Sequence, residues 1–110
     1  MAKKSREEVL RIVREFRSEI ERIYGDRLRA VYLYGSYARG DARDDSDIDI
    51  AVVLDGPVDQ NEEIFRVSDV RAEMSLSEDC LIMPLFVSYT DLIDSRESIH
   101  KNIAGEGVAL

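Results

Sequence analysis

Residues Gly35 to Ile50 read Gly-Ser-Tyr-Ala-Arg-Gly-Asp-Ala-Arg-Asp-Asp-Ser-Asp-Ile-Asp-Ile, and this stretch decides the fold that we expect for the chain. Two aspartates, Asp47 and Asp49, stand at the head of an apolar run that continues to Leu54. Alternation that becomes continuously apolar is typical of a buried β-strand. Residues two apart in a strand share a face, with Cα atoms roughly 6.5 Å apart. We therefore expect both carboxylates on one face and the neighbouring isoleucines on the other.

The paired aspartates predict a site for a divalent metal ion. Two carboxylates at this separation repel each other unless a positive charge lies between them. Mg²⁺ prefers carboxylate oxygens and is often held by one or two of them together with water and substrate phosphates. Asp47 and Asp49 are therefore the expected metal ligands and catalytic residues.

The residues ahead of the aspartates predict a turn that binds phosphate. A run rich in β-branched and aromatic residues, Leu28 to Tyr34, predicts a strand that stops at Gly35. Gly35 permits a positive φ and a close backbone approach, and the Ser36 hydroxyl can donate to a phosphate oxygen. A short helical turn through Arg39 would aim N–H groups and a guanidinium at the same anion. Ser46 is a further candidate for nucleotide binding, with the shaping of the turn as its alternative role.

This pattern resembles the signature of the minimal nucleotidyltransferases, small members of the DNA polymerase beta-like superfamily. In that family a Gly-Ser pair precedes an Asp-x-Asp motif, and here ten residues separate Ser36 from Asp47. The resemblance implies an α/β nucleotidyltransferase fold, a small mixed sheet flanked by helices, in one domain spanning residues 1–110. It also implies Mg²⁺-dependent transfer of AMP from ATP to a tyrosine of a HEPN-domain toxin, for which this chain would be the antitoxin.

Family members with full activity add a third carboxylate from a later strand, and the sequence departs from that pattern. The candidate strand, Cys80 to Ser88, contains no acidic residue. Asp79, immediately before it, is the nearest candidate for a third catalytic carboxylate, and an exposed turn residue is the alternative. Pro84 inside this strand predicts an edge position or a bulge. The number of metal ions therefore stays open.

Composition limits the remaining classes of function. The chain has 110 residues, of which 15 are basic and 23 acidic, for a net charge of −8. That charge argues against direct binding of nucleic acid through its phosphates and would speed association with a basic partner. The single cysteine, Cys80, excludes an internal disulfide and fits a reducing cytoplasm. Since no signal peptide is visible and no apolar stretch approaches the ~20 residues that span a bilayer, we expect a cytoplasmic protein without membrane contact.

Helical periodicity predicts amphipathic helices on either side of the motif. Ser5 and Glu8 form a capping box at the start of a helix that should end at Gly25, acting as a left-handed cap. A second helix is expected from about Asn61 to Leu76, and Tyr89 to Ile103 predicts a short helical pair. The inward positions expected in the first helix are Val9, Ile12, Val13, Phe16, Ile20 and Ile23, and in the second Ile64, Val67, Val70 and Met74.

Some residues keep two interpretations. Tyr37 lies inside the motif and could stack on a base or be modified, whereas Tyr32 and Tyr34 are expected to pack in the sheet. His100 follows Arg96 at a spacing one residue short of that in HEPN ribonucleases, which favours a surface histidine. The acidic residues between the two motifs, Asp41, Asp44 and Asp45, are expected to form a solvated loop.

Two classes of function therefore remain open. The first is an enzyme that transfers AMP, and the second is a binding module that neutralises its partner by masking it, with a vestigial metal site. A small-molecule nucleotidyltransferase of the aminoglycoside type is disfavoured, because the chain has no room for a second domain to build a substrate cleft. The sequence leaves homo- or hetero-oligomers open.

Overall fold

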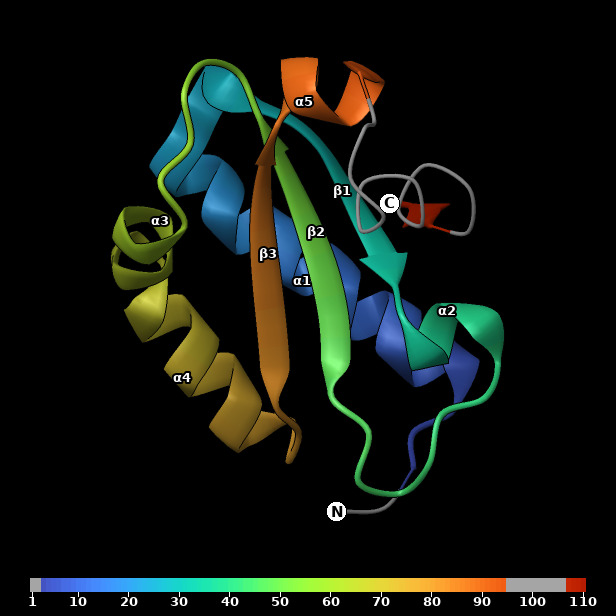
Figure 1. Ribbon diagram of the computed structural model, residues 1–110. Helices are drawn as coiled ribbons and strands as arrows, with labels where there is room; N and C mark the ends of the chain where they lie inside the picture. Colours follow the sequence, from blue (N-terminus) through green and yellow to red (C-terminus); the bar gives the residue numbers. More distant parts are fainter. Residues whose placement is uncertain (1–2, 95–106) are drawn as a thin grey trace.

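The structure is a computed structural model that describes residues 3–94 and 107–110 (Figure 1). Four strands form one sheet in the order β3-β2-β1-β4. The strands are β1 (Leu28–Tyr34), β2 (Ile48–Leu54), β3 (Ile82–Ser88) and β4 (Val108–Ala109). Strand β1 pairs antiparallel with β2 and with β4, whereas β2 and β3 are parallel. The expected small mixed sheet is therefore confirmed.

Helices flank this sheet at its back and along the edge formed by β3. Over the described residues they are α1 (Arg6–Tyr24), α2 (Ser36–Arg39), α3 (Gln60–Arg66), α4 (Ser68–Ser77) and α5 (Tyr89–Asp94), with a 3-10 turn at Gly25–Arg27. In Figure 1, α1 crosses behind the sheet, α3 and α4 lie beside β3, and α2 follows the end of β1. None of these helices combines the length and apolarity required to cross a bilayer.

Helix α1 provides the apolar layer behind the sheet. The predicted capping box is present, because the Ser5 hydroxyl accepts from the Glu8 N–H and the Glu8 carboxylate accepts from the Ser5 N–H. Ile23 was expected to face inward, but it is 37% exposed, and Tyr24 is buried in its place. The reason is helical geometry, since Tyr24 lies one turn after the buried Ile20 on the same stripe.

The end of α1 also differs in detail from the prediction. Gly25 caps the helix with the expected positive φ of 55°, but its ψ of −128° lies outside the left-handed helical region. The Tyr24 ring packs against Phe86 at a centroid distance of 6.1 Å, and its hydroxyl donates to the buried Glu63 carboxylate at 2.9 Å. This hydrogen bond joins α1 to α3.

The second expected helix is interrupted. Val67 separates α3 from α4 with φ −101° and ψ 8°, and its side chain is fully buried. Ile64, Val70 and Met74 pack against the core from either side of this break. The inward positions were therefore predicted correctly, whereas the single continuous helix was wrong, because the helix changes direction where Val67 enters the core.

Strand β3 forms an outer edge of the sheet, which confirms the edge position predicted from Pro84. Its register with β2 is continuous, so Pro84 causes no bulge. The Gln60 amide donates to the Pro84 carbonyl at 3.1 Å and accepts from the Phe86 N–H at 2.8 Å. Arg71 Nε donates to the Ile82 carbonyl at 2.7 Å. Side chains therefore cover an edge that would otherwise pair with another strand.

Several predictions fall outside the described residues. They concern the segment after Asp94: the Arg96 and His100 pair, and the remainder of the helical pair to Ile103.

Candidate active site

The two faces of β2 carry different side chains. Ile48 and Ile50 are fully buried in the core shared with α1. Asp49 lies between them in sequence and is partly buried, as is Asp47, which directly precedes the strand. Because side chains alternate along a strand, the aspartates belong to the face away from α1. The predicted separation of carboxylates from isoleucines agrees with this burial pattern.

Gly35 lies directly against Asp49. It has φ 74° and ψ −155°, a conformation that residues with side chains rarely adopt. A Cβ atom at this position would overlap Asp49 Oδ2 and would lie 3.1 Å from Asp49 Cγ. Any residue with a side chain at position 35 would therefore displace the Asp49 carboxylate, which explains why this position is glycine. This contact joins the two motifs in one corner of the molecule, where β1 ends and β2 begins.

Helix α2 opens at this corner. The N–H groups of Ala38 and Arg39 donate to the Gly35 carbonyl at 3.1 and 3.0 Å, and Gly40 ends the turn in the left-handed region. The N–H groups of Ser36 and Tyr37 find no acceptor within the described part of the chain, as expected in the first turn of a helix. The corner thus combines a carboxylate pair with unused backbone donors.

Among the described residues, negative charge predominates at this corner. Burial raises the pKa of Asp49, the negative charge of Asp47 raises it further, and the positive charge of Arg39 lowers it. Tyr34 pairs with Asp49 across β1 and β2, and burial together with the Asp49 charge raises the pKa of Tyr34 to about 12. Two repelling carboxylates in a partly buried site fit a hard divalent cation.

Arg39 and Ser46, both predicted to bind nucleotide, have different surroundings. Arg39 is close enough for its charge to lower the pKa of Asp49, although its Nε also pairs with the Asp41 carboxylate at 3.3 Å. The Ser46 hydroxyl accepts from the Arg43 N–H at 2.7 Å, and the Ser46 N–H donates to the Arg43 carbonyl at 3.0 Å. Ser46 therefore shapes the loop, and its contact with nucleotide stays a prediction.

Asp79, the candidate third carboxylate, ends helix α4. It is exposed, it has φ 50°, and the Cys80 N–H donates across it to the Ser75 carbonyl at 3.1 Å. This is the pattern of a helix that ends through a left-handed residue. Within the described residues, no group of three or more Asp, Glu, His or Cys side chains could hold a metal ion. The structure thus gives Asp79 a role in the turn and does not join it to Asp47 and Asp49.

Tyr37 packs in the core, and its hydroxyl accepts from the Lys4 N–H at 3.2 Å. The stacking of Tyr37 on a base and its modification stay predictions. Sequence reasoning did not identify Met83, which lies opposite Asp49 on the neighbouring strand β3. An apolar run gives no signal for such a neighbour, because it does not specify strand register.

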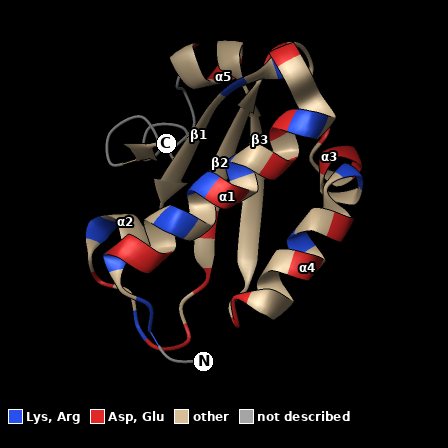
Figure 2. Ribbon diagram, turned by 180° about the vertical axis from the view of Figure 1, so that it is seen from behind, with Lys and Arg blue, Asp and Glu red and all other residues tan. Residues whose placement is uncertain are grey.

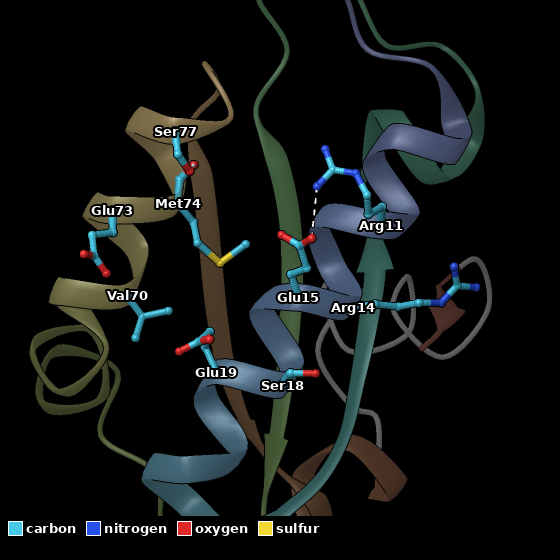
Figure 3. Close-up of a pocket in the computed structure, with 9 residues that line it drawn as sticks. All are labelled: Arg11, Arg14, Glu15, Ser18, Glu19, Val70, Glu73, Met74 and Ser77. Atoms are coloured by element: carbon cyan, nitrogen blue, oxygen red, sulfur yellow. Dashed lines mark hydrogen bonds and ion pairs between the residues drawn. The ribbon is translucent and has the colours of Figure 1, made fainter.

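A groove of about 640 Å³ lies elsewhere, between α1 and α4 on the covered side of the sheet (Figure 3). Met74 points into it, and charges of both signs surround it. Arg11 at its rim already pairs with Glu15 at 3.1 Å and with Glu78 at 2.8 Å. Figure 2 shows the same mixture of signs along α1. This hollow lacks the convergent carboxylates and free backbone donors of the Gly35 corner, which we therefore take as the chemical site.

Comparison with known proteins agrees with this choice. A family model described as a nucleotidyltransferase domain matches residues 13–103. The Methanocaldococcus jannaschii protein named "Putative protein adenylyltransferase MJ0141" is 34% identical over 83 residues, which cover 76% of this chain and 83% of that protein. "Putative protein adenylyltransferase MJ0604" of the same organism is 32% identical over 100 residues, covering 89% of this chain and 93% of the relative.

Solved structures show the same fold. A nucleotidyltransferase structure from Sulfolobus solfataricus superposes with a TM-score of 0.64 at 22% identity, covering 99% of this chain and 89% of that one. A toxin–antitoxin crystal structure with AMP-PNP gives a TM-score of 0.58 at 20% identity, with 86% and 69% covered. The site geometry, the family match and the two relatives lead to one conclusion: the chain belongs to the nucleotidyltransferase domain family and is a nucleotidyltransferase enzyme.

Proposed function

We propose that this enzyme transfers AMP from MgATP to a protein hydroxyl, a tyrosine of a HEPN-domain toxin, and so acts as an antitoxin in the cytoplasm. The observation that carries the proposal is the contact between Gly35 and the Asp49 carboxylate. It brings the predicted phosphate-binding turn and the predicted metal ligands into one corner. A nucleoside triphosphate and its divalent cation need these two elements side by side.

Each side chain of the corner has a separate task in this reaction. The backbone at Gly35 and Ser36 would hold the β- and γ-phosphates, with Arg39 adding positive charge. Asp47 and Asp49 would hold the cation, which, when bound, polarises the α-phosphate and neutralises developing negative charge. The protein itself supplies orientation, because in phosphoryl-type transfers positioning and electrostatics provide most of the acceleration.

The comparisons support the choice of donor and acceptor. Two relatives above 30% identity are named as protein adenylyltransferases, which favours AMP as the group and a protein as the acceptor. A neighbour in fold was solved as a toxin–antitoxin complex with AMP-PNP, which makes ATP and a toxin the first molecules to test. The HEPN class of the toxin and its tyrosine rest on the family resemblance of the sequence motifs.

One observation favours a second candidate, a module that neutralises its partner by masking it. Only two carboxylates meet at the corner among the described residues, and Asp79 stands apart in a turn. A site with fewer ligands could have lost its activity while keeping the surface that binds the partner. The close fit of Gly35 on Asp49 argues for the enzyme, because masking alone would not require it.

One assay separates the two candidates. The protein is incubated with Mg²⁺, labelled ATP and the protein encoded by the neighbouring gene, and the products are examined by mass spectrometry. Transfer predicts an AMP increment on a tyrosine of the partner, absent with Asp47→Asn and present with the matched exposed-loop control Asp45→Asn. Masking predicts a stable complex without any increment, and that result would overturn the proposal.

A further inference from the structure

The strand beside the carboxylates places Met83 next to Asp49. Strands β2 and β3 run parallel with Ile48 opposite Ile82 and Asp49 opposite Met83. Opposite residues share a face of the sheet and lie roughly 4.8 Å apart. Burial agrees, because both isoleucines are fully buried, whereas Met83 is 38% exposed. Met83 therefore occupies the position on β3 that lies nearest to Asp49, and a side chain there could bind the same cation as Asp49.

Leu81, two residues before Met83, does not supply another ligand. The Leu81 carbonyl accepts from the Ile48 N–H at 2.9 Å, which places Leu81 beside the start of β2, next to Asp47. Leu81 is apolar and 37% exposed. The β3 side of the corner thus presents a leucine and a thioether where a carboxylate could have stood. A thioether is a soft ligand that does not suit Mg²⁺.

We infer that Met83 limits the cation site to two carboxylates, so that cation and nucleotide bind this enzyme as one unit. This inference rests on the proposed function. Two carboxylates leave most of an octahedral coordination shell to water and to the phosphates of the nucleotide. The protein should therefore bind the cation weakly in the absence of nucleotide and much more tightly in its presence. By linkage, the cation should raise the affinity for nucleotide by the same factor.

Arg71 influences the choice of variant. Its Nη2 lies 3.3 Å from the Met83 sulfur, and its Nε holds the Ile82 carbonyl. A glutamate at position 83 has the length to follow the methionine toward this guanidinium. An aspartate is shorter and keeps its oxygens close to β3, within reach of the Asp49 carboxylate. Met83→Asp is therefore the variant that adds a third ligand.

The first measurement uses the full wild-type chain and Mn²⁺, with free Mn²⁺ followed by electron paramagnetic resonance. AMP-PNP binds Mn²⁺ on its own, so a protein-free titration gives that amount, and only the Mn²⁺ bound beyond it is assigned to the protein. We expect AMP-PNP to tighten Mn²⁺ binding at least about tenfold, because the phosphates add charged ligands. Equal affinity with and without AMP-PNP would overturn the inference and leave the proposed function standing. If no Mn²⁺ binds even with AMP-PNP, both the inference and the proposed function are wrong.

The second measurement tests Met83 itself. Met83→Asp should tighten binding of Mn²⁺ without nucleotide at least about tenfold and reduce the dependence on AMP-PNP. Ile93→Asp is the matched control: it adds the same charge at a 67% exposed apolar residue of α5, at the opposite end of β3 (Figure 1). Equal effects of the two variants, or no effect of Met83→Asp on a folded protein, would overturn the role of Met83. If Met83→Asp does not fold, Mn²⁺ binding by the wild-type chain with and without AMP-PNP still tests whether cation and nucleotide bind together.

Discussion

The two faces of β2 show how one strand serves stability and chemistry at once. On the covered face, Ile48 and Ile50 are fully buried against α1 and stabilise the fold. The opposite face is partly exposed only at its start, at Asp47 and Asp49, and we call this part the open face. There the two carboxylates repel each other, and burial raises the pKa of Asp49. Adjacent residues therefore have opposite effects on folding. The open face is therefore suited to binding a positively charged group, since Arg39 is the one described residue whose charge lowers the pKa of Asp49.

The largest expected effect comes from neutralising the open face. Asp47→Asn or Asp49→Asn should lower AMP transfer by about a thousandfold or more, because each removes a charged ligand at the reacting phosphate. Circular dichroism should show an unchanged fold. Asp45 is exposed, and Asp45→Asn should retain transfer when both variants are assayed with labelled ATP. Transfer at the wild-type rate by either site variant would contradict the assignment of the carboxylates.

The covered face should respond in the opposite way. Ile50→Ala removes a fully buried side chain from the core and should lower the free energy of unfolding by about 2–5 kcal/mol. Urea denaturation measures this loss. Below the unfolding midpoint, nucleotide binding by the remaining folded protein should be unchanged. A large loss of affinity at constant folded fraction would show that the two faces are not independent.

Gly35 tests whether the position of the Asp49 carboxylate matters for transfer, because the glycine lies directly against that carboxylate. Gly35→Ala should lower transfer by about a hundredfold, since a displaced carboxylate misplaces the reacting groups. This backbone conformation, which is nearly restricted to glycine, should also cost about 1–3 kcal/mol of stability. Gly56→Ala is the matched control, with a φ of 81° but no atom within 4 Å of the added Cβ. It should lose similar stability and keep transfer; if both variants lose transfer equally, the Asp49 contact is not the cause.

The charge of Asp49 predicts a pH dependence of stability. Its pKa is raised in the folded protein, so its favourable contribution exists at low pH and is lost as pH rises through the raised pKa. Without divalent cations, Asp49→Asn should therefore be more stable than wild type at pH 7, with the gain shrinking toward pH 4. Solvent screening keeps this gain below about 1 kcal/mol. Urea titrations of both proteins at the two pH values measure it, and a gain that is equal at both would exclude ionisation as the cause.

The sequence predicted much of the frame and the centre of the site. Strand β1 was predicted with its observed limits, and the alternation of β2 follows directly from Asp47-Ile48-Asp49-Ile50. Local pattern and capping suffice for such elements. The break at Val67 and the pairing of Asp49 with Met83 could not be predicted, because they depend on how distant elements meet. The same limit applies to Gly35, whose contact with Asp49 exists only when β1 and β2 are paired.

Substitutions of Asp79 should have the smallest effects on transfer and stability. Asp79 is acidic but lies outside β2, so these variants test whether the catalytic carboxylates are confined to that strand and its start. Asp79 holds a left-handed conformation at the end of α4, where glycine is the preferred residue. Asp79→Gly should therefore keep transfer and change the free energy of unfolding by no more than about 1 kcal/mol, since relief of strain opposes the added freedom of the unfolded chain. Asp79→Asn separates charge from conformation, because asparagine tolerates the same backbone geometry and keeps nearly the same shape. A loss of transfer in Asp79→Asn at unchanged stability would make Asp79 a third catalytic carboxylate after all. If both variants retain transfer, Asp47 and Asp49 on the open face of β2 remain the catalytic carboxylates and Asp79 is not one of them.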